Sequence, residues 1–291
     1  MSYPDKISKT IKEFQYFSPK TVSEAVSILE RYNAKVLAGG TDLLPLMKQR
    51  VVTPEHIVNI RDIPELAYIQ EDDEGLKIGA MTTISAIRES KIIEEKYISI
   101  YEAARKFAHP QIRNMATVGG NICRSSPSAD MVPPLITFDA EVKLVGPKGS
   151  RSVLLENFFT GPGENVLEQE LLTEIIVPRE DGRYGTAFEK IMRNSGDLAK
   201  VNCAVKITIS DRTCQDIRIV LGAVAARSIR SKNAEQAIKA KTISDDVIET
   251  AAQKVAEDIA PITDVRSTSV YRTEVSKVLT RRLIELAVER T

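Results

Sequence analysis

The chain opens with short apolar runs that alternate with one amphipathic segment. Between residues 25 and 29 apolar side chains recur at helical spacing, which indicates the buried face of a helix. Thr21 precedes this segment and Glu24 follows three residues later, the capping-box pattern of a helix start. We therefore predict a helix here, and short strands at 14–17, 35–38 and 56–60.

The middle of the chain has the pattern of hairpins and short helices. Strand-like runs flank an acidic turn at 71–75 and a glycine-containing turn at 146–149, so two β-hairpins are expected. Another strand is expected at 171–177, where Pro178 ends it. Helices are expected at 43–50, 85–89 and 99–107.

The pattern changes after the charged stretch 179–183. Alternating segments come first and helical segments follow, the order of an antiparallel sheet covered by a helical layer. We therefore expect an α+β protein with one domain over residues 1–182 and a second over 183–291. The second domain is expected to have strands at 184–193, 201–210 and 217–223, and helices at 233–240, 244–259 and 271–288.

The balance of acidic and basic side chains argues against some classes of binding partner. The 291 residues include 40 basic and 40 acidic side chains, so the formal net charge is zero. Such a balance argues against general attraction to nucleic acid or to an anionic membrane. The first residues are polar and no apolar run approaches about 20 residues, so we expect neither a signal peptide nor a membrane span, and a cytoplasmic location.

The number and spacing of the cysteines are also typical of a protein in a reducing compartment. Cys123, Cys203 and Cys214 are widely spaced and odd in number, which argues against a disulfide framework. They are too few for an iron–sulfur cluster held by four cysteines of this chain. We expect no metal in this chain, and we interpret Cys123 as a small buried residue rather than a redox thiol.

Two glycine pairs carry the candidate chemistry. Each follows an apolar run and precedes a small polar residue, and glycine lets a ligand approach the backbone closely. Backbone N–H groups at 39–41 and 119–121, with the Thr41 hydroxyl, would then be donors to an anion. Either pair alone fits an ordinary tight turn, but two pairs favour a ligand with adjacent charges, such as a dinucleotide diphosphate. The motifs are Ala38-Gly39-Gly40-Thr41-Asp42 and Thr117-Val118-Gly119-Gly120-Asn121.

The first pair lies between a predicted strand and a predicted helix. Asp42 is expected to cap the helix that starts at Leu43, with direct contact to a ligand as the alternative. The sequence has neither the GxGxxG fingerprint of a Rossmann fold nor the GK[ST] of a P-loop. A different kind of dinucleotide-binding fold is therefore indicated.

Segments along nearly the whole chain, from about Phe14 to the C-terminus, match one family pattern. Segments 36–43, 111–114 and 117–121 resemble the FAD-binding medium subunit of molybdenum hydroxylases, the family of xanthine dehydrogenase and aerobic carbon monoxide dehydrogenase. The paired glycine motifs make this resemblance specific. Further matching segments are 126–130, 158–163, 170–175, 187–190, 196–199 and 269–272.

The resemblance implies a fold and a role. The fold would be a vanillyl-alcohol-oxidase (PCMH-type) FAD-binding domain of two α/β subdomains, followed by a smaller domain of antiparallel sheet and helices. The chain would hold FAD non-covalently, although His109 is a candidate for the histidine linkage found in some proteins of this fold. Substrate would be oxidised at a molybdopterin in a large subunit, and two [2Fe-2S] clusters in a small subunit would pass electrons to the FAD. NAD+, a ferredoxin, a quinone or oxygen would accept them, in a complex expected to be a dimer of heterotrimers.

The resemblance also implies the cofactor-binding residues. The two glycine segments would hold the diphosphate and adjoining ribose. Asp130 would contact a polar group of the ribose or adenine, and Leu172 would make an apolar contact near the isoalloxazine. Lys190 would approach the pyrimidine end of the ring, with Glu189 as a competing assignment and a surface Glu–Lys pair as the alternative. The complete set is Val36, Leu37, Ala38, Gly39, Gly40, Thr41, Asp42, Leu43, Ala108, Thr117, Val118, Gly119, Gly120, Asn121, Asp130, Leu172 and Lys190.

Competing functions are a self-contained flavin reductase or oxidase of the same fold and an assembly module that has lost FAD. The first would need a proton donor and a substrate domain with its own signature, and neither is evident. The intact glycine pairs argue against the second. Arg179, Arg183 and Arg193 are candidates for contact with a nucleotide acceptor or a partner subunit, with a solvated charged edge as the alternative.

Overall fold

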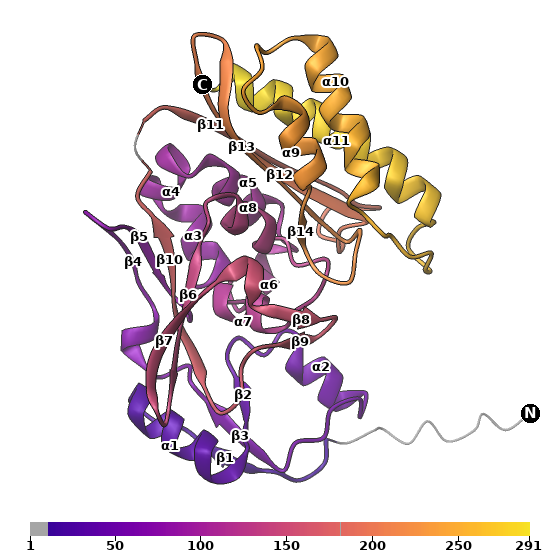
Figure 1. The fold of residues 1–291 in the computed structure, drawn as a ribbon. Coiled ribbons are helices and arrows are strands. Elements are labelled where there is room, and N and C mark those ends of the chain that lie inside the picture. The colour runs from indigo at the N-terminus through magenta and orange to yellow at the C-terminus, as the bar shows by residue number, and fades with distance from the viewer. Residues whose placement is uncertain (1–10, 181) are drawn as a thin grey trace, which may run out of the picture.

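The structure is a computed structural model that describes residues 11–180 and 182–291. Figure 1 shows sheets and helices in successive layers, with the N-terminal unit at the bottom and the C-terminal helices at the top. Both helices and strands contribute throughout, so the predicted α+β class is confirmed. Among the described residues, no helix is both long and apolar enough to cross a membrane.

A small parallel sheet begins the fold, with its strands in the order β1–β3–β2. The helix α1 starts as predicted, because the Thr21 hydroxyl accepts a hydrogen bond from the Glu24 N–H at 3.2 Å. Its buried residues pack against β3 in one apolar cluster. The elements are β1 (Gln15–Phe17), α1 (Val22–Tyr32), β2 (Lys35–Leu37), α2 (Leu43–Lys48), β3 (His56–Asn59) and the 3-10 helix η1 (Pro64–Leu66).

A five-stranded antiparallel sheet follows, in the order β4–β5–β10–β6–β7. Both predicted hairpins are present, as β4–β5 and β6–β7, and β10 lies between them. The strands are β4 (Ile69–Asp72), β5 (Gly75–Gly79), β6 (Glu141–Gly146), β7 (Gly149–Leu154) and β10 (Leu171–Pro178). The 3-10 helix η2 (Leu155–Asn157) and the hairpin β8 (Phe159–Gly161) to β9 (Glu164–Asn165) connect β7 to β10.

Short helices pack against this sheet. Those predicted at 85–89 and 99–107 are α3 (Ile84–Glu89) and α5 (Ile98–Lys106). The sequence pattern missed the others, because they contain glycine or proline, residues that usually mark loops, or are a single turn or two long. They are α4 (Lys91–Lys96), α6 (Pro110–Arg113), α7 (Val118–Cys123) and α8 (Val132–Thr137).

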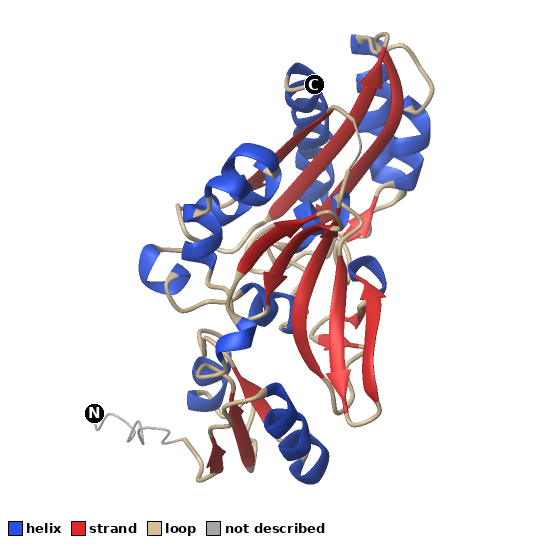
Figure 2. Ribbon diagram, turned by 90° about the vertical axis from the view of Figure 1, so that its left-hand side faces the viewer, coloured by secondary structure: helices blue, strands red, loops and turns tan. Residues whose placement is uncertain are grey.

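The C-terminal part is a four-stranded antiparallel sheet with helices on one face (Figures 1 and 2). Its strands lie in the order β11–β12–β13–β14, and each predicted strand and helix of this part has a counterpart. The elements are β11 (Tyr184–Ile191), β12 (Val201–Ser210), β13 (Thr213–Gly222), β14 (Ile229–Arg230), α9 (Lys232–Ile238), α10 (Asp245–Lys254), η3 (Val255–Glu257) and α11 (Ser269–Glu289).

The C-terminal sheet is buried on both faces, which fixes it to the first part of the chain. Phe188, Ala204 and Val220 pack into the core of the five-stranded sheet and its helices. Residues on the opposite face pack against α9, α10 and α11. Ion pairing adds to this contact, since Arg290 binds Glu102 at 2.7 Å. The two parts therefore share a continuous interface rather than a flexible tether.

Candidate functional site

The two glycine pairs, distant in the sequence, lie side by side in the fold. A Cβ atom at Gly39 would sit 1.8 Å from the carbonyl oxygen of Met115, just before the second pair. A Cβ atom at Gly120 would lie 3.9 Å from that of Ala38. The missing side chain of Gly39 therefore lets the two backbone segments approach each other closely, whereas the spacing at Gly120 is an ordinary van der Waals contact. The fold thus brings both motifs to one place.

The first glycine segment leaves backbone donors open. Gly40 has a φ of +74°, a left-handed conformation that glycine adopts without strain. Within residues 11–180 and 182–291, none of the N–H groups of 39–43 has a protein acceptor. The guanidinium of Arg61 lies beside this segment and donates to the Ala38 carbonyl at 3.4 Å. This segment can therefore receive an anion, as the sequence suggested.

The second glycine segment differs, because its donors are already used. It is not a loop but the first turn of α7, which Thr117 caps through its hydroxyl at 3.1 Å from the Gly120 N–H. The N–H of Gly119 donates to the Ala80 carbonyl at 2.9 Å, and that of Asn121 to the Thr117 carbonyl at 2.9 Å. The expectation of free backbone donors at 119–121 is therefore wrong. Capping and close packing, not ligand binding, occupy these groups.

Asp42 is the N-cap residue of α2, but its carboxylate makes no capping hydrogen bond. The predicted cap is correct in position and wrong in mechanism, because the backbone of Asp42 is itself helical and directs the side chain away from the helix. The carboxylate instead faces Arg124, whose Nε lies 3.7 Å from Oδ1. Asp42 therefore remains a charged group beside the open donors.

Asp130 and Lys190 form a buried ion pair across the two parts of the chain. Lys190 Nζ lies 2.7 Å from Asp130 Oδ2, and the Lys190 side chain is fully buried. Burial raises the pKa of Asp130, and the neighbouring ammonium opposes that shift. Asn202 Nδ2 donates to the other carboxylate oxygen at 3.1 Å. Glu189 points elsewhere and pairs with Lys106, so the structure orients Lys190, not Glu189, into the interior.

The buried pair is connected to the second glycine segment. Met131 follows Asp130 in the chain, and its N–H donates to Asn121 Oδ1 at 3.3 Å. Asn121 belongs to α7, directly after the glycine pair. Lys190, Asp130 and α7 therefore form one connected structure, although the positions are far apart in the sequence.

Ala108 lies in a loop that a buried arginine holds. Its φ is 34°, unusual for a residue with a side chain. Arg113 Nη1 donates to the carbonyls of Phe107 and Ala108, both at 2.7 Å. The sequence did not predict this role, although Arg113 belongs to the 111–114 motif. An arginine in an otherwise neutral stretch was the one feature that could have indicated it. His109 packs against Gly196, where an added Cβ would meet the imidazole at 2.5 Å.

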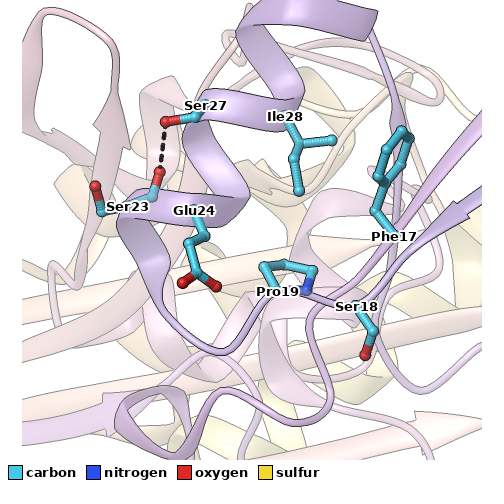
Figure 3. A pocket seen from close by; sticks show the side chains of 7 residues that line it. All are labelled: Phe17, Ser18, Pro19, Ser23, Glu24, Ser27 and Ile28. Carbon is cyan, nitrogen blue, oxygen red and sulfur yellow. Dashed lines mark hydrogen bonds between the residues drawn. The ribbon is translucent and has the colours of Figure 1, made fainter.

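Leu172 is buried in β10 within the core of the first part. A separate surface hollow, shown in Figure 3, is lined by Phe17, Pro19 and Ile28, with the Ser18 hydroxyl and the hydroxyl and carboxylate groups of α1 around them. None of its lining residues belongs to a glycine segment, and its only charged group is Glu24. The glycine segments, not this hollow, form the candidate site.

Family models match both parts of the chain. The model described as the FAD binding domain in molybdopterin dehydrogenase matches residues 12–180. The model described as the CO dehydrogenase flavoprotein C-terminal domain matches residues 186–287. Fold and site therefore define an FAD-binding flavoprotein of the molybdopterin dehydrogenases.

Individual relatives extend this match to almost the full length. The glyceraldehyde dehydrogenase medium chain of Sulfolobus acidocaldarius is 36% identical, over 93% of this chain and 96% of the relative. The xanthine dehydrogenase FAD-binding subunit of Escherichia coli O157:H7 is 32% identical, over 94% and 95%. The solved structure of carbon monoxide dehydrogenase from Hydrogenophaga pseudoflava is 37% identical, with a TM-score of 0.94 over 97% of this chain and 99% of that one. This chain belongs to the FAD-binding medium subunits of the molybdenum hydroxylases.

Proposed function

We propose that this chain is the electron-transfer subunit of a heterotrimeric molybdenum hydroxylase. It receives electrons from two [2Fe-2S] clusters in a small subunit, after a large molybdopterin subunit has oxidised the substrate, and passes them through FAD to NAD+ or another acceptor. The support is its near-complete coverage of relatives named as medium chains of glyceraldehyde and carbon monoxide dehydrogenases. A cytoplasmic location and a dimer of heterotrimers belong to the same proposal.

The residues present fit a bound dinucleotide at the first glycine segment. Open N–H groups at 39–43 would hold the diphosphate, and Gly40 gives this segment its left-handed turn, with a φ of +74°. Thr41 would add its hydroxyl. The second segment would contribute mainly to the shape of the binding site, because its N–H groups are bonded within the protein. The proposed contact set keeps Val36 to Leu43, Ala108, 117–121, Asp130, Leu172 and Lys190.

FAD, when bound, would allow electrons that arrive one at a time to leave in pairs. The chain's own residues bind and orient it. Leu172 would give an apolar contact, and Lys190 would place an ammonium group, paired with the Asp130 carboxylate, in a buried, low-dielectric region. Asp130 holds the Lys190 ammonium at 2.7 Å, so that charge has a fixed position.

The division into domains is proposed at 182/183. Arg179 and Arg183 lie in the segment between β10 and β11, next to this boundary. Each part supplies one member of the Asp130–Lys190 pair. A flavin bound near that pair would therefore report on the contact between the domains.

The test is co-expression of the chain with and without its neighbouring genes, followed by the absorbance spectrum and a pull-down. We expect a yellow protein that co-purifies with a molybdenum subunit and a subunit carrying two [2Fe-2S] clusters. Reduction of the flavin by substrate should require both partners. Turnover of an organic substrate by the lone chain would instead support the self-contained reductase or oxidase, and a colourless complex would support a module without FAD.

A further inference from the structure

The open donors of the first glycine segment have a negative neighbour. The Asp42 side chain is 64% exposed and lies at the end of the 39–43 run. A diphosphate bound there would bring two more negative charges, and like charges at short range repel. Arg61 lies at the Ala38 end of the segment, and a second positive group near Asp42 would offset the repulsion there. This inference rests on the proposed placement of FAD.

Arg124 lies at the place where such a charge is needed. It is the residue directly after α7, and its N–H donates to the Gly120 carbonyl at 3.0 Å. Asn165 Nδ2 fixes the surrounding backbone by donating to the Cys123 carbonyl at 3.2 Å and the Ser125 hydroxyl at 2.9 Å. The main chain of Arg124 is therefore held by two elements.

The guanidinium itself is uncommitted. Its nearest charged neighbour, Asp42 Oδ1, is 3.7 Å from Nε, beyond hydrogen-bond distance. In the part of the chain that the structure describes, the Arg124 side chain makes no hydrogen bond. Gly163 lies close to the guanidinium, since an added Cβ there would be 3.5 Å from Nη1. Arg113, by contrast, binds two carbonyls.

We propose that Arg124 is a diphosphate-binding residue of the FAD site. In the free protein its charge offsets Asp42, and in the complex its N–H groups bind a phosphate oxygen. Guanidinium geometry suits paired hydrogen bonds to phosphate. Asp42 and the diphosphate therefore compete for one guanidinium, and Arg124 joins the two glycine segments, since it extends from α7 toward the start of α2.

The test measures FAD binding by the full chain after removal and re-addition of the flavin, at salt concentrations from low to high. Arg124→Gln should raise the Kd for FAD at least tenfold at low salt, and the difference should shrink as salt rises, because salt screens exposed charges. Arg124→Lys, which keeps the charge, should stay within about threefold of the wild type. Arg151→Gln is the matched control, since Arg151 is similarly exposed (47% against 40%) and pairs with Glu170 in another part of the sheet.

Asp42→Asn gives an independent test that does not depend on the folding of the Arg124 variants. It should lower the Kd for FAD about threefold or more, because the guanidinium loses its competitor. The proposal is overturned if Arg124→Gln binds FAD within twofold of the wild type, if its loss is the same at every salt concentration, or if Asp42→Asn weakens binding. Failure of the wild-type chain to bind FAD in any context would contradict the proposed function instead.

Discussion

The two glycine segments look alike in the sequence and differ in the fold. In the first, the N–H groups of 39–43 have no acceptor among the described residues, whereas in the second the N–H groups of Gly119, Gly120 and Asn121 are all bonded within the protein. The first segment thus has backbone donors available for the proposed ligand, whereas the donors of the second segment are used within the protein. A glycine pair by itself does not distinguish these roles, because glycine permits close approach of either a ligand or another backbone segment.

The difference between the two glycine segments leads us to expect different effects of mutation. Changes in the second segment and its supports should lower the stability of the protein, with loss of flavin as a consequence. Changes in the first segment should lower the affinity for FAD and leave the stability nearly unchanged. The following variants test this contrast, from the largest expected effect to the smallest.

Lys190→Met should have the largest effect, because it leaves the buried Asp130 carboxylate without its partner. Removal of one member of a buried ion pair costs about 3–5 kcal/mol. The free energy of unfolding in urea measures this cost. The double variant Lys190→Met/Asp130→Asn should recover much of the loss, since it removes the unpaired charge; equal stability of the single variant and the wild type would contradict the support role of the pair.

Gly119→Ala should destabilise the fold by about 1–3 kcal/mol through overpacking. Its Cβ would sit 2.7 Å from both the Cβ and the carbonyl oxygen of Ala80, so α7 and the segment that directly follows β5 would have to separate. A melting curve of the flavin-free chain checks this prediction. Gly149→Ala serves as a comparison for space alone, since nothing lies within 4 Å of its Cβ position, although its φ of +116° adds strain of its own.

Thr117→Val should cost about 1 kcal/mol, because the variant loses the hydroxyl that caps α7 and keeps the side-chain shape. The measurement is again the free energy of unfolding, without FAD. Thr117→Ser keeps the cap and should stay close to the wild type. If both variants are equally stable, the cap is not what holds the second segment in place.

Thr41→Val should have the smallest effect on stability, within about 0.5 kcal/mol, because the Thr41 hydroxyl makes no hydrogen bond to any of the residues that the structure describes. Its effect should appear in FAD binding, as a several-fold rise in Kd equivalent to the loss of one hydrogen bond of about 1 kcal/mol. Fluorescence titration of the flavin-free chain with FAD measures it. A variant that loses stability but keeps its FAD affinity would reverse the contrast between the two segments.

Much of the secondary structure followed from local pattern. The α1 helix starts where Thr21 and Glu24 predicted, and both hairpins of the five-stranded sheet are present. These features depend on neighbouring residues, so the sequence contains their full cause. The helices α4, α6, α7 and α8 were missed. α8 contains two prolines, α7 contains two glycines, and α4 and α6 are only six and four residues long, so tertiary packing rather than local pattern stabilises them.

The candidate site was predictable only in part. The sequence pattern and its family resemblance named both glycine segments, Asp130 and Lys190. It did not reveal that Asp130 and Lys190 bind each other, that Arg113 holds the loop at Ala108, or that Arg124 faces Asp42. Packing in the folded chain decides whether each of these pairs makes contact, because it sets the directions of the side chains.

The sequence by itself determined the α+β class, the family and most of the strands and longer helices. Periodicity, caps and turn residues act locally, and the family motifs are present in the sequence itself. The tertiary structure decided which backbone N–H groups stay open. That depends on whether an acceptor from another segment, such as the Ala80 carbonyl at Gly119, comes within hydrogen-bond distance. Two similar glycine pairs therefore took different roles only when the chain folded around them.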